Sequence, residues 1–325
     1  MTSYSLPLDT YRAARERIRP YTRRTPMLPQ PPLSDEMPPQ LRYKLENMQV
    51  VGSFKPRGVF NTLLQMTTAQ RERGVVTASG GNHGLAVAYA AWRLGLHATV
   101  YLPASATADR VARVKAWGAQ VVQHGINWND AHAAASVYAA ANGLAYIHPF
   151  DAEGTLAGQG TIGLELLEDV PDIDCVLIAI GGGGLIAGIA DVIKQVKPEV
   201  RIIGVEPVGA ASMMAAVDAG RVVELPSVRT IADTLAPRAV SERTRALTAQ
   251  YVDELVLVDD RSMVDAMRWL WTHTNQLVEP SGAAVIAALR TGVVSVSECN
   301  APVALICGGN ASVGEVFVQY ERQIT

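Results

Sequence analysis

Short apolar runs alternate with alanine-rich stretches in the first half of the chain. The apolar runs at 74–78 and 98–102 are separated by the stretch 85–94, whose apolar residues recur at helical spacing. The same alternation continues with apolar runs at 119–122 and 145–147 and helical stretches at 108–117 and 129–141. Near-continuous apolar strands separated by helices are typical of parallel sheets that helices cover on both faces. This half predicts an open α/β sheet.

The second half repeats the alternation. Four further apolar runs have strand length, at 174–180, 200–205, 255–258 and 303–307. The stretch 185–196 between the first two reads as a helix. The fold class that we predict is therefore α/β, with two open, twisted, mostly parallel sheets and helices on both faces of each. The proline-containing break at 148–151 is a plausible crossing between two domains.

Composition narrows the class of protein. A chain of 325 residues, 49% apolar and 18% charged, is typical of a soluble globular protein with two domains. The formal net charge of −3 gives no sign of the excess positive charge that binding to nucleic acid or to an anionic membrane would need. No signal peptide is visible, and the apolar uncharged run 175–190, which contains four glycines, is too short to span a membrane. Three widely spaced cysteines predict no disulfide framework, so we expect a cytoplasmic protein.

Lys55 is the first candidate for chemistry. It is one of only five lysines, and it lies in the segment Gly52–Gly58 among glycine, serine and an aromatic residue. A partly desolvated lysine amine can lose its proton and act as a nucleophile and a base, whereas arginine cannot form a Schiff base at working pH. The alternative is a solvated cation at a turn, which is the usual state of a lysine.

Two glycine-rich segments suggest an anion site. Gly181–Gly184 follows one predicted strand and opens a helix, where free backbone N–H groups and the helix N-terminus favour a phosphate. Ser79, Gly181 and Gly308 each follow a different predicted strand, and ligands of open α/β sheets bind beyond the carboxyl ends of strands. A cleft between two sheets would collect all three. One alternative is a nicotinamide oxidoreductase, because Gly182-x-Gly184-x-x-Ala187 followed by Glu206 matches a dinucleotide fingerprint.

The order of six motifs favours a different cofactor. They are Gly52–Gly58, Ser79–Gly84, Gly158–Thr161, Gly181–Leu185, Glu279–Ala284 and Cys307–Asn310. Together they resemble the serine/threonine dehydratase family of pyridoxal-phosphate (PLP) enzymes, which has the tryptophan-synthase-β fold, or PLP fold type II. The resemblance runs from Thr25 to Asn310. It implies pyridoxal 5′-phosphate as cofactor and a homodimer. It also suggests a large PLP-binding domain of residues 1–48 and 149–325 and a small substrate-loop domain of residues 49–148.

The resemblance also implies roles for particular residues. Lys55 would be the catalytic Schiff-base lysine and the base for the α-proton. Phe54 would line one face of the ring, Asn82 would bind the ring hydroxyl, and Cys307 would lie beside the pyridine nitrogen. The phosphate would be held by Gly181, Gly182, Gly183 and Gly184. The α-carboxylate of the substrate would be held, chiefly through backbone N–H groups, by Ser79, Gly80, Gly81, Asn82 and His83.

Two positions depart from the family pattern. Racemases of this group carry a serine where this chain has Gly80, which disfavours an efficient racemase. The divalent-cation site of the family pairs a glutamate, here Glu206, with an acid at the position of Ser212, so the need for a cation stays open and Glu206 is a weak metal candidate.

Trp128 lies in a loop that faces the cleft mouth in the family, and no Arg or Lys occupies that loop. The chain ends at Thr325, so we expect no C-terminal regulatory domain.

These observations predict a PLP-dependent ammonia-lyase. Its reaction would be the α,β-elimination (dehydration and deamination) of a β-hydroxy amino acid, most simply L-threonine or L-serine, to an α-keto acid and ammonia. Three alternatives remain open: a β-replacement synthase, an amino-acid racemase of the same fold, and a relative that binds the cofactor without catalysis.

Overall fold

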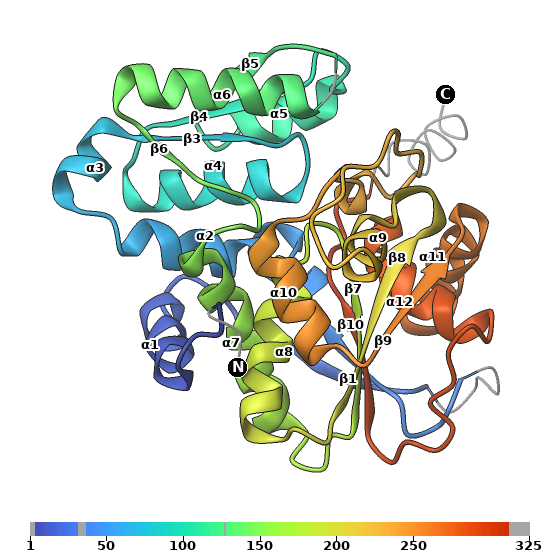
Figure 1. Cartoon of the computed structure of the whole chain (residues 1–325). Coiled ribbons are helices and arrows are strands. Elements are labelled where there is room, and N and C mark those ends of the chain that lie inside the picture. Colours follow the sequence, from blue (N-terminus) through green and yellow to red (C-terminus); the bar gives the residue numbers. More distant parts are fainter. Residues whose placement is uncertain (1–3, 32–36, 127, 312–325) are drawn as a thin grey trace, which may run out of the picture.

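A computed structural model describes residues 4–31, 37–126 and 128–311, in which the strands form two sheets (Figure 1). The four-stranded sheet has the order β5-β4-β3-β6, and every neighbouring pair is parallel. The six-stranded sheet has the order β1-β2-β10-β7-β8-β9, and only the β1–β2 pair is antiparallel. The predicted fold class, two mostly parallel sheets with helices, is confirmed.

The predicted apolar runs all fall on strands. The strands are β1 (Met27–Pro29), β2 (Arg42–Leu45), β3 (Val75–Ala78), β4 (Ala98–Leu102), β5 (Gln120–Gln123), β6 (Ala145–Tyr146), β7 (Cys175–Ala179), β8 (Arg201–Pro207), β9 (Glu254–Val258) and β10 (Pro302–Ile306). The two central strands β7 and β10 are buried along their whole length. Strands covered on both faces have no position for a solvated side chain, which is why these two read as unbroken apolar runs.

Helices cover both sheets. They are α1 (Leu8–Ile18), α2 (Lys55–Leu64), α3 (Thr68–Arg73), α4 (Asn82–Leu94), α5 (Ala108–Lys115), α6 (Trp128–Asn142), α7 (Glu153–Asp169), α8 (Gly184–Val196), α9 (Ser212–Asp218), α10 (Glu242–Tyr251), α11 (Asp260–Thr274) and α12 (Pro280–Arg290). In Figure 1, α7 and α8 lie on one side of the six-stranded sheet and α11 and α12 on the other, while α6 and α4 lie on opposite sides of the four-stranded sheet.

Helix α7 joins the two parts of the molecule, because it packs against both α2 and α8. Glycines make this close packing possible. A Cβ atom on Gly158 would lie 2.4 Å from the carbonyl oxygen of Arg57, and one on Gly160 would lie 2.3 Å from the ring of Tyr11 in α1. The sequence analysis treated Gly158–Thr161 only as a family motif, and the structure shows that it is the middle of a buried helix.

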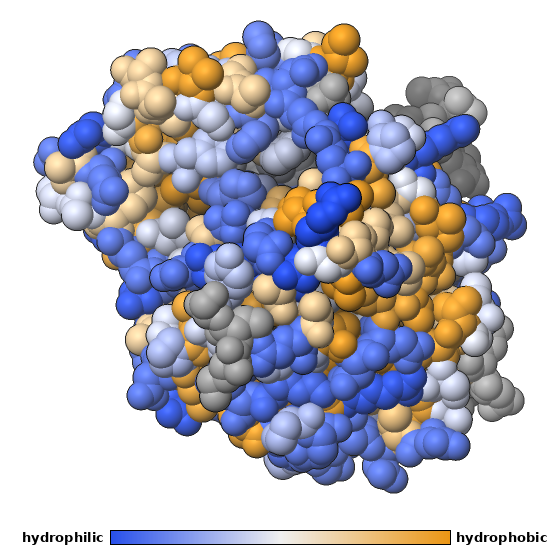
Figure 2. All heavy atoms as spheres, in the orientation of Figure 1, coloured by the Kyte–Doolittle hydropathy of each residue, from blue (hydrophilic) through white to orange (hydrophobic). Residues whose placement is uncertain are grey.

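The division into domains at 48/49 and 148/149 remains a prediction, and the ends of the predicted large domain, 1–3 and 312–325, lie outside the described residues together with 32–36. Within the part of the chain that the structure describes, the helices are too short or too polar to cross a membrane. Figure 2 shows hydrophilic and hydrophobic residues interspersed on the visible face of the molecule, with hydrophilic residues predominating.

Candidate active site

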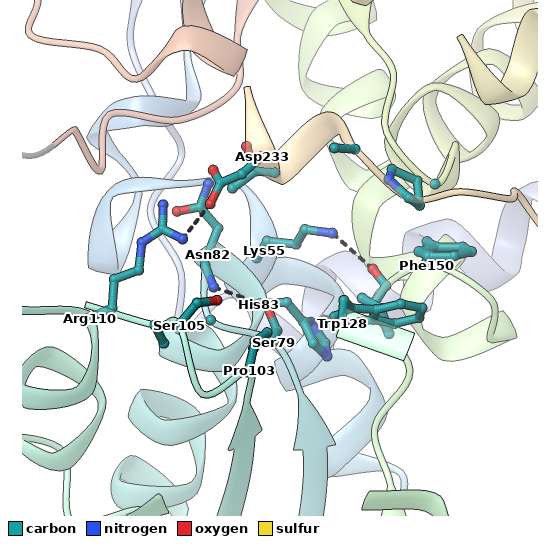
Figure 3. Close-up of a pocket in the computed structure, with 18 of the residues that line it drawn as sticks. Lys55, Ser79, Asn82, His83, Pro103, Ser105, Arg110, Trp128, Phe150 and Asp233 are labelled. Atoms are coloured by element: carbon teal, nitrogen blue, oxygen red, sulfur yellow. Dashed lines mark hydrogen bonds and ion pairs between the residues drawn. The ribbon is translucent and has the colours of Figure 1, made fainter. Parts of the chain in front are cut away.

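The predicted site segments meet in one place. Ser79 follows β3, Gly181 follows β7 and Cys307 follows β10, and all three lie at carboxyl ends of strands, as expected. Two adjoining cavities, of about 310 Å³ and about 40 Å³, connect these segments (Figure 3). Both cavities are lined by Lys55, Asn82, Phe150, Gly182 and Thr234. The structure therefore brings the lysine, the substrate-loop candidates and the glycine loop together.

The segment before Lys55 is held by the motif that follows β10. The Phe54 N–H donates to the carbonyl of Cys307 at 3.2 Å, and the Gly309 N–H donates to the carbonyl of Gly52 at 2.8 Å. Between them, Ser53 and Gly308 form an antiparallel bridge. Two segments about 250 residues apart thus fix each other and determine where α2 begins.

Val51, in the same segment, has a backbone conformation that is rare for valine. Its φ of 53° lies in the left-handed region, where a β-branched residue is strained. Its carbonyl accepts a hydrogen bond from the Asn310 side-chain amide at 2.8 Å, which helps to hold this conformation. Strained backbone is concentrated at functional sites, where the surrounding structure imposes it.

The amine of Lys55 points into the larger cavity (Figure 3). Its Nζ donates to the Pro149 carbonyl at 2.9 Å and lies 4.9 Å from the ring centre of Phe54. Burial lowers the pKa of Lys55 to about 8, although Cys307 and Glu279 act in the opposite direction. A neutral amine is therefore accessible near neutral pH, which is what a lysine needs to attack a carbonyl group.

The glycine loop presents bare backbone amides at the N-terminus of α8. Gly183 has a φ of 86°, which favours glycine, and a Cβ there would lie 2.4 Å from the Met213 side chain. A Cβ on Gly182 would lie 2.2 Å from the ring of Phe150. No other residue fits at these two positions, and a loop of free N–H groups at a helix N-terminus suits a phosphate.

The segment Ser79–His83 forms the N-terminus of α4. The side chain of Asn82 is oriented by two neighbours, because its Nδ2 donates to Glu279 and its Oδ1 accepts from Asn310 at 2.6 Å. One hydrogen of the Asn82 amide remains for a ligand. The Nε2 of His83 bonds to the carbonyl of Ile147 at 2.9 Å, and burial lowers the pKa of His83 to about 3. His83 is therefore neutral throughout the physiological range.

Cys307 lies in the smaller cavity, near Lys55. Its Sγ donates to the carbonyl of Ser281 at 3.3 Å. Burial, with the neighbouring Glu279 as a further cause, raises the pKa of the thiol to about 12. The group therefore stays a neutral thiol at working pH.

Glu206 lies at the end of β8 and accepts hydrogen bonds from the backbone at the start of α9. Its two carboxylate oxygens accept from the N–H groups of Met213 and Met214, both at 2.8 Å, and burial raises its pKa to about 7. Both oxygens are thus engaged with the backbone at the start of α9, which gives Glu206 a structural role. Across the described ranges, no group of three or more His, Cys, Asp or Glu side chains is arranged to hold a metal ion. The role of Glu206 toward a cation stays open.

Two charged residues of the cavity were missed. Arg110, in the first turn of α5, forms an ion pair with Asp233, and both line the larger cavity (Figure 3). The sequence analysis found no basic residue in the loop beside Trp128, but Arg110 reaches the cavity from another element. The available signal was its position just beyond the carboxyl end of β4. Trp128 itself lines the cavity, while its neighbour Asn127 lies outside the described residues.

These groups suit a phosphate-bearing aldehyde. An amine with a lowered pKa, a loop of bare amides and a neutral thiol line adjoining spaces, and these are the groups that hold PLP in a protein. The comparison with protein families agrees, because the model named "Pyridoxal-phosphate dependent enzyme" matches residues 18–308. The chain belongs to this family, and its cofactor is pyridoxal phosphate.

The similar proteins include both lyases and racemases. The chain is 38% identical to an L-threonine ammonia-lyase of Geobacter sulfurreducens over 98% of its own length and 79% of the relative. It is 36% identical to a serine racemase of Oryza sativa subsp. indica, over 97% of this chain and 94% of that one. Among solved structures, maize serine racemase superposes with a TM-score of 0.93 at 35% identity, covering 99% of this chain and 98% of that chain. Lyases and racemases are thus about equally similar to this chain.

Proposed function

We propose that this protein is an ammonia-lyase that eliminates water and ammonia from a β-hydroxy amino acid, with L-threonine and L-serine as the simplest substrates. The products are an α-keto acid and ammonia. The observation that carries the proposal is the position of the Lys55 amine, in one cavity with both the N-terminal loop of α4 and the glycine loop of α8.

Each segment has a defined task in this proposal. Lys55 would hold the cofactor covalently, and its free amine would be the base that removes the α-proton. The backbone N–H groups from Ser79 to His83 would bind the α-carboxylate at the N-terminus of α4. The bare amides of Gly181–Gly184 would bind the phosphate, Phe54 would line one face of the cofactor ring, and the free hydrogen of the Asn82 amide would be available to the ring hydroxyl.

The electronic environment favours elimination. When bound, the cofactor supplies an electron sink for the negative charge that develops at Cα. Cys307, which would lie beside the ring nitrogen, is a neutral thiol, since burial raises its pKa to about 12, and it would therefore not promote protonation of that nitrogen. A moderate electron sink suits the loss of a β-hydroxyl group.

Gly80 distinguishes the lyase from the racemase. Racemisation needs a second proton donor on the face of Cα opposite Lys55, and the racemases of this group have a serine at the position of Gly80. Glycine offers no donor there. The site has room for one, because a Cβ on Gly80 would contact only a methyl group of Leu102, at 3.4 Å. We therefore assign the protein to the lyases.

The test is release of keto acid and ammonia from L-threonine and L-serine. Wild-type protein loaded with PLP is expected to release both products in equal amounts, and Lys55→Ala is expected to release none. Lys115→Ala, which removes an exposed lysine at the end of α5, is the matched control and should keep full activity. Failure of the wild type with every β-hydroxy amino acid would exclude the lyase.

The same assay separates the alternatives. A β-replacement synthase would release little keto acid until a thiol is added, and would then consume that thiol. A non-catalytic relative would change its visible absorption on adding substrate without forming product. The homodimer and the cytoplasmic location are also proposals, and light scattering in solution tests the first of them.

A further inference from the structure

Five aromatic rings form a cluster beside the larger cavity, which we call the aromatic wall; they belong to Trp128, His132, Tyr146, His148 and Phe150, and of these only Trp128 and Phe150 line the cavity itself. Trp128 begins α6, and its indole N–H donates to the carbonyl of Ala78 at 2.9 Å. His132, one turn later on the same helix, stacks on the indole with ring centres 4.8 Å apart and planes 9° apart. The indole is thus held both at its edge and on one face.

The wall continues behind Trp128. The Nδ1 atom of His132 is hydrogen-bonded to the hydroxyl of Tyr146 at 2.6 Å. The rings of His132 and His148 meet edge to face at 6.0 Å, and those of His148 and Phe150 do so at 4.6 Å. Edge-to-face and stacked arrangements are the favourable geometries for such rings. The wall therefore consists of rings that restrain one another.

This wall borders the reacting groups on two sides. Ala78, which accepts the indole N–H, directly precedes Ser79 of the proposed carboxylate loop. Pro149, whose carbonyl accepts a hydrogen bond from the Lys55 amine, lies between His148 and Phe150. Trp128 and Phe150 both line the cavity, and Figure 3 shows them on one side of Lys55. A side chain attached to the substrate Cα on this side would contact the indole.

The opposite side of the cavity carries two charged side chains that neutralise each other. Arg110 is already paired with Asp233, and Figure 3 shows this pair on the side of Lys55 away from Trp128. A carboxylate on the substrate that approached Arg110 would lie near the negative charge of Asp233, which opposes its binding. The rest of the cavity lining mixes uncharged polar side chains with apolar ones, and the apolar ones include Pro103, Pro149, Ala236 and Pro237.

We propose that Trp128 determines substrate specificity, and that the preferred substrate is a β-hydroxy amino acid with an apolar, preferably aromatic, β-substituent. This inference rests on the proposed lyase function and defines its substrate class. His132 is a positioning residue, because it holds the indole without lining the cavity. The aromatic substituent gains contact with the indole, whereas serine leaves that surface unused.

The first experiment compares substrates with wild-type holoenzyme. The value of kcat/KM for L-threo-β-phenylserine should exceed that for L-serine by about tenfold or more. L-threo-3-hydroxyaspartate should be the poorest of the three. Keto-acid release from L-serine with no preference for phenylserine, or a preference for hydroxyaspartate, would overturn the specificity proposal and leave the lyase intact. If none of the three substrates released keto acid, the proposed lyase function itself would be contradicted.

Variants then assign the preference to the aromatic wall. Trp128→Leu keeps apolar volume, and it should lower kcat/KM for phenylserine by about tenfold while changing that for L-serine less than about threefold. Trp271→Leu, an exposed tryptophan on α11, is the matched control and should change neither. Equal losses for both substrates in Trp128→Leu would contradict the assignment.

The positioning role has its own readout. His132→Ala should reduce the ratio of the two kcat/KM values, and His132→Phe, which restores a ring for stacking, should recover it. Binding without turnover gives an independent check, because L-phenylalanine and L-alanine have no β-hydroxyl to lose. Calorimetry should show tighter binding of L-phenylalanine to the wild type and loss of this difference in Trp128→Leu; an equal affinity in the wild type would refute the proposal.

Discussion

At the residue scale, the account depends on two small differences in chemistry at Lys55 and Gly80. Burial brings the Lys55 amine within reach of its neutral form, and in the proposed lyase the absence of a side chain at Gly80 would leave one face of the substrate without a proton donor. Relatives named as lyases and as racemases match this chain about equally well, so overall similarity does not choose between the two reactions. Individual side chains do.

Gly80→Ser should create racemase activity. The new hydroxyl fits, because a Cβ at this position meets only a methyl group of Leu102 at 3.4 Å. We expect the rate of D-serine formation from L-serine to rise by about tenfold or more, since a positioned acid–base group contributes at least that much. Chiral chromatography measures it, and Gly80→Ala controls for the added carbon. An unchanged ratio of racemisation to elimination would show that Gly80 does not decide the reaction.

Attachment of the cofactor to the apoprotein should depend on pH through Lys55. The neutral amine is the nucleophile, and it predominates above its pKa of about 8. The rate of attachment should therefore rise through pH 8 and level off above it, whereas an ordinary exposed lysine would still gain rate up to about pH 10. Stopped-flow absorption follows this rate. A rise that continues to pH 10 would contradict the lowered pKa.

At the element scale, a buried ionic network fixes α2 and thereby Lys55. Arg57, on the first turn of α2, contacts Glu46 at 2.8 Å and Glu165 of α7 at 2.7 Å. Lys44 of β2 contacts the same Glu165 at 2.7 Å. Lys44 also contacts Asp169 of α7 at 3.3 Å, so two cations and three anions connect α2, β2 and α7.

Arg57→Ala should destabilise the fold severely. Removing Arg57 leaves the buried Glu46 carboxylate without its cation, which costs about 3–5 kcal/mol in comparable cases. Arg12→Ala, which breaks the exposed pair with Asp9, is the control and should cost less than about 1 kcal/mol. Urea unfolding measures both free energies. Similar losses in the two variants would show that the network does not stabilise α2.

The sequence predicted the elements of the two sheets better than it predicted the helix between them. Strands such as β7 and β10 are buried on both faces, so their apolar runs are visible in the sequence. Helix α7 contains several glycines, which lower its intrinsic helix propensity, and its stability depends on close packing against α2 and α8. That information is tertiary and is not present in a local pattern.

The same reasoning applies to the site. Lys55, the glycine loop and the Ser79–His83 segment follow strand ends in a recognisable order, so the sequence was enough to name them. Arg110 and Asp233 are separated by 123 positions in the sequence and carry no motif. Only the folded chain brings them into the same cavity, together with Trp128.

At the scale of the whole molecule, the Arg110–Asp233 pair bridges the cavity from α5, beside the four-stranded sheet, to the segment 233–235 on the other side. Both side chains remain partly exposed, at 42% and 48%. Screening by water limits such a pair to about 0.2–1 kcal/mol. The pair therefore contributes little to the stability of the fold, and we expect its effect on the binding of a substrate.

Arg110→Ala should raise KM by up to about fivefold and leave kcat nearly unchanged, because the pair is worth less than about 1 kcal/mol. A double-mutant cycle with Asp233→Ala should give a coupling free energy in the same range, and high salt should weaken it. Steady-state kinetics measure all of these. A loss of kcat without a change in KM would instead place Arg110 in the chemical step.

The most direct test of the central claim is to locate the covalent bond. Reduction of the holoenzyme with borohydride fixes the cofactor to the lysine that holds it, and peptide mass mapping then distinguishes among the five lysines of the chain. We expect the added mass on the peptide that contains Lys55 and on no other. Modification of a different lysine, or of none, would contradict the account.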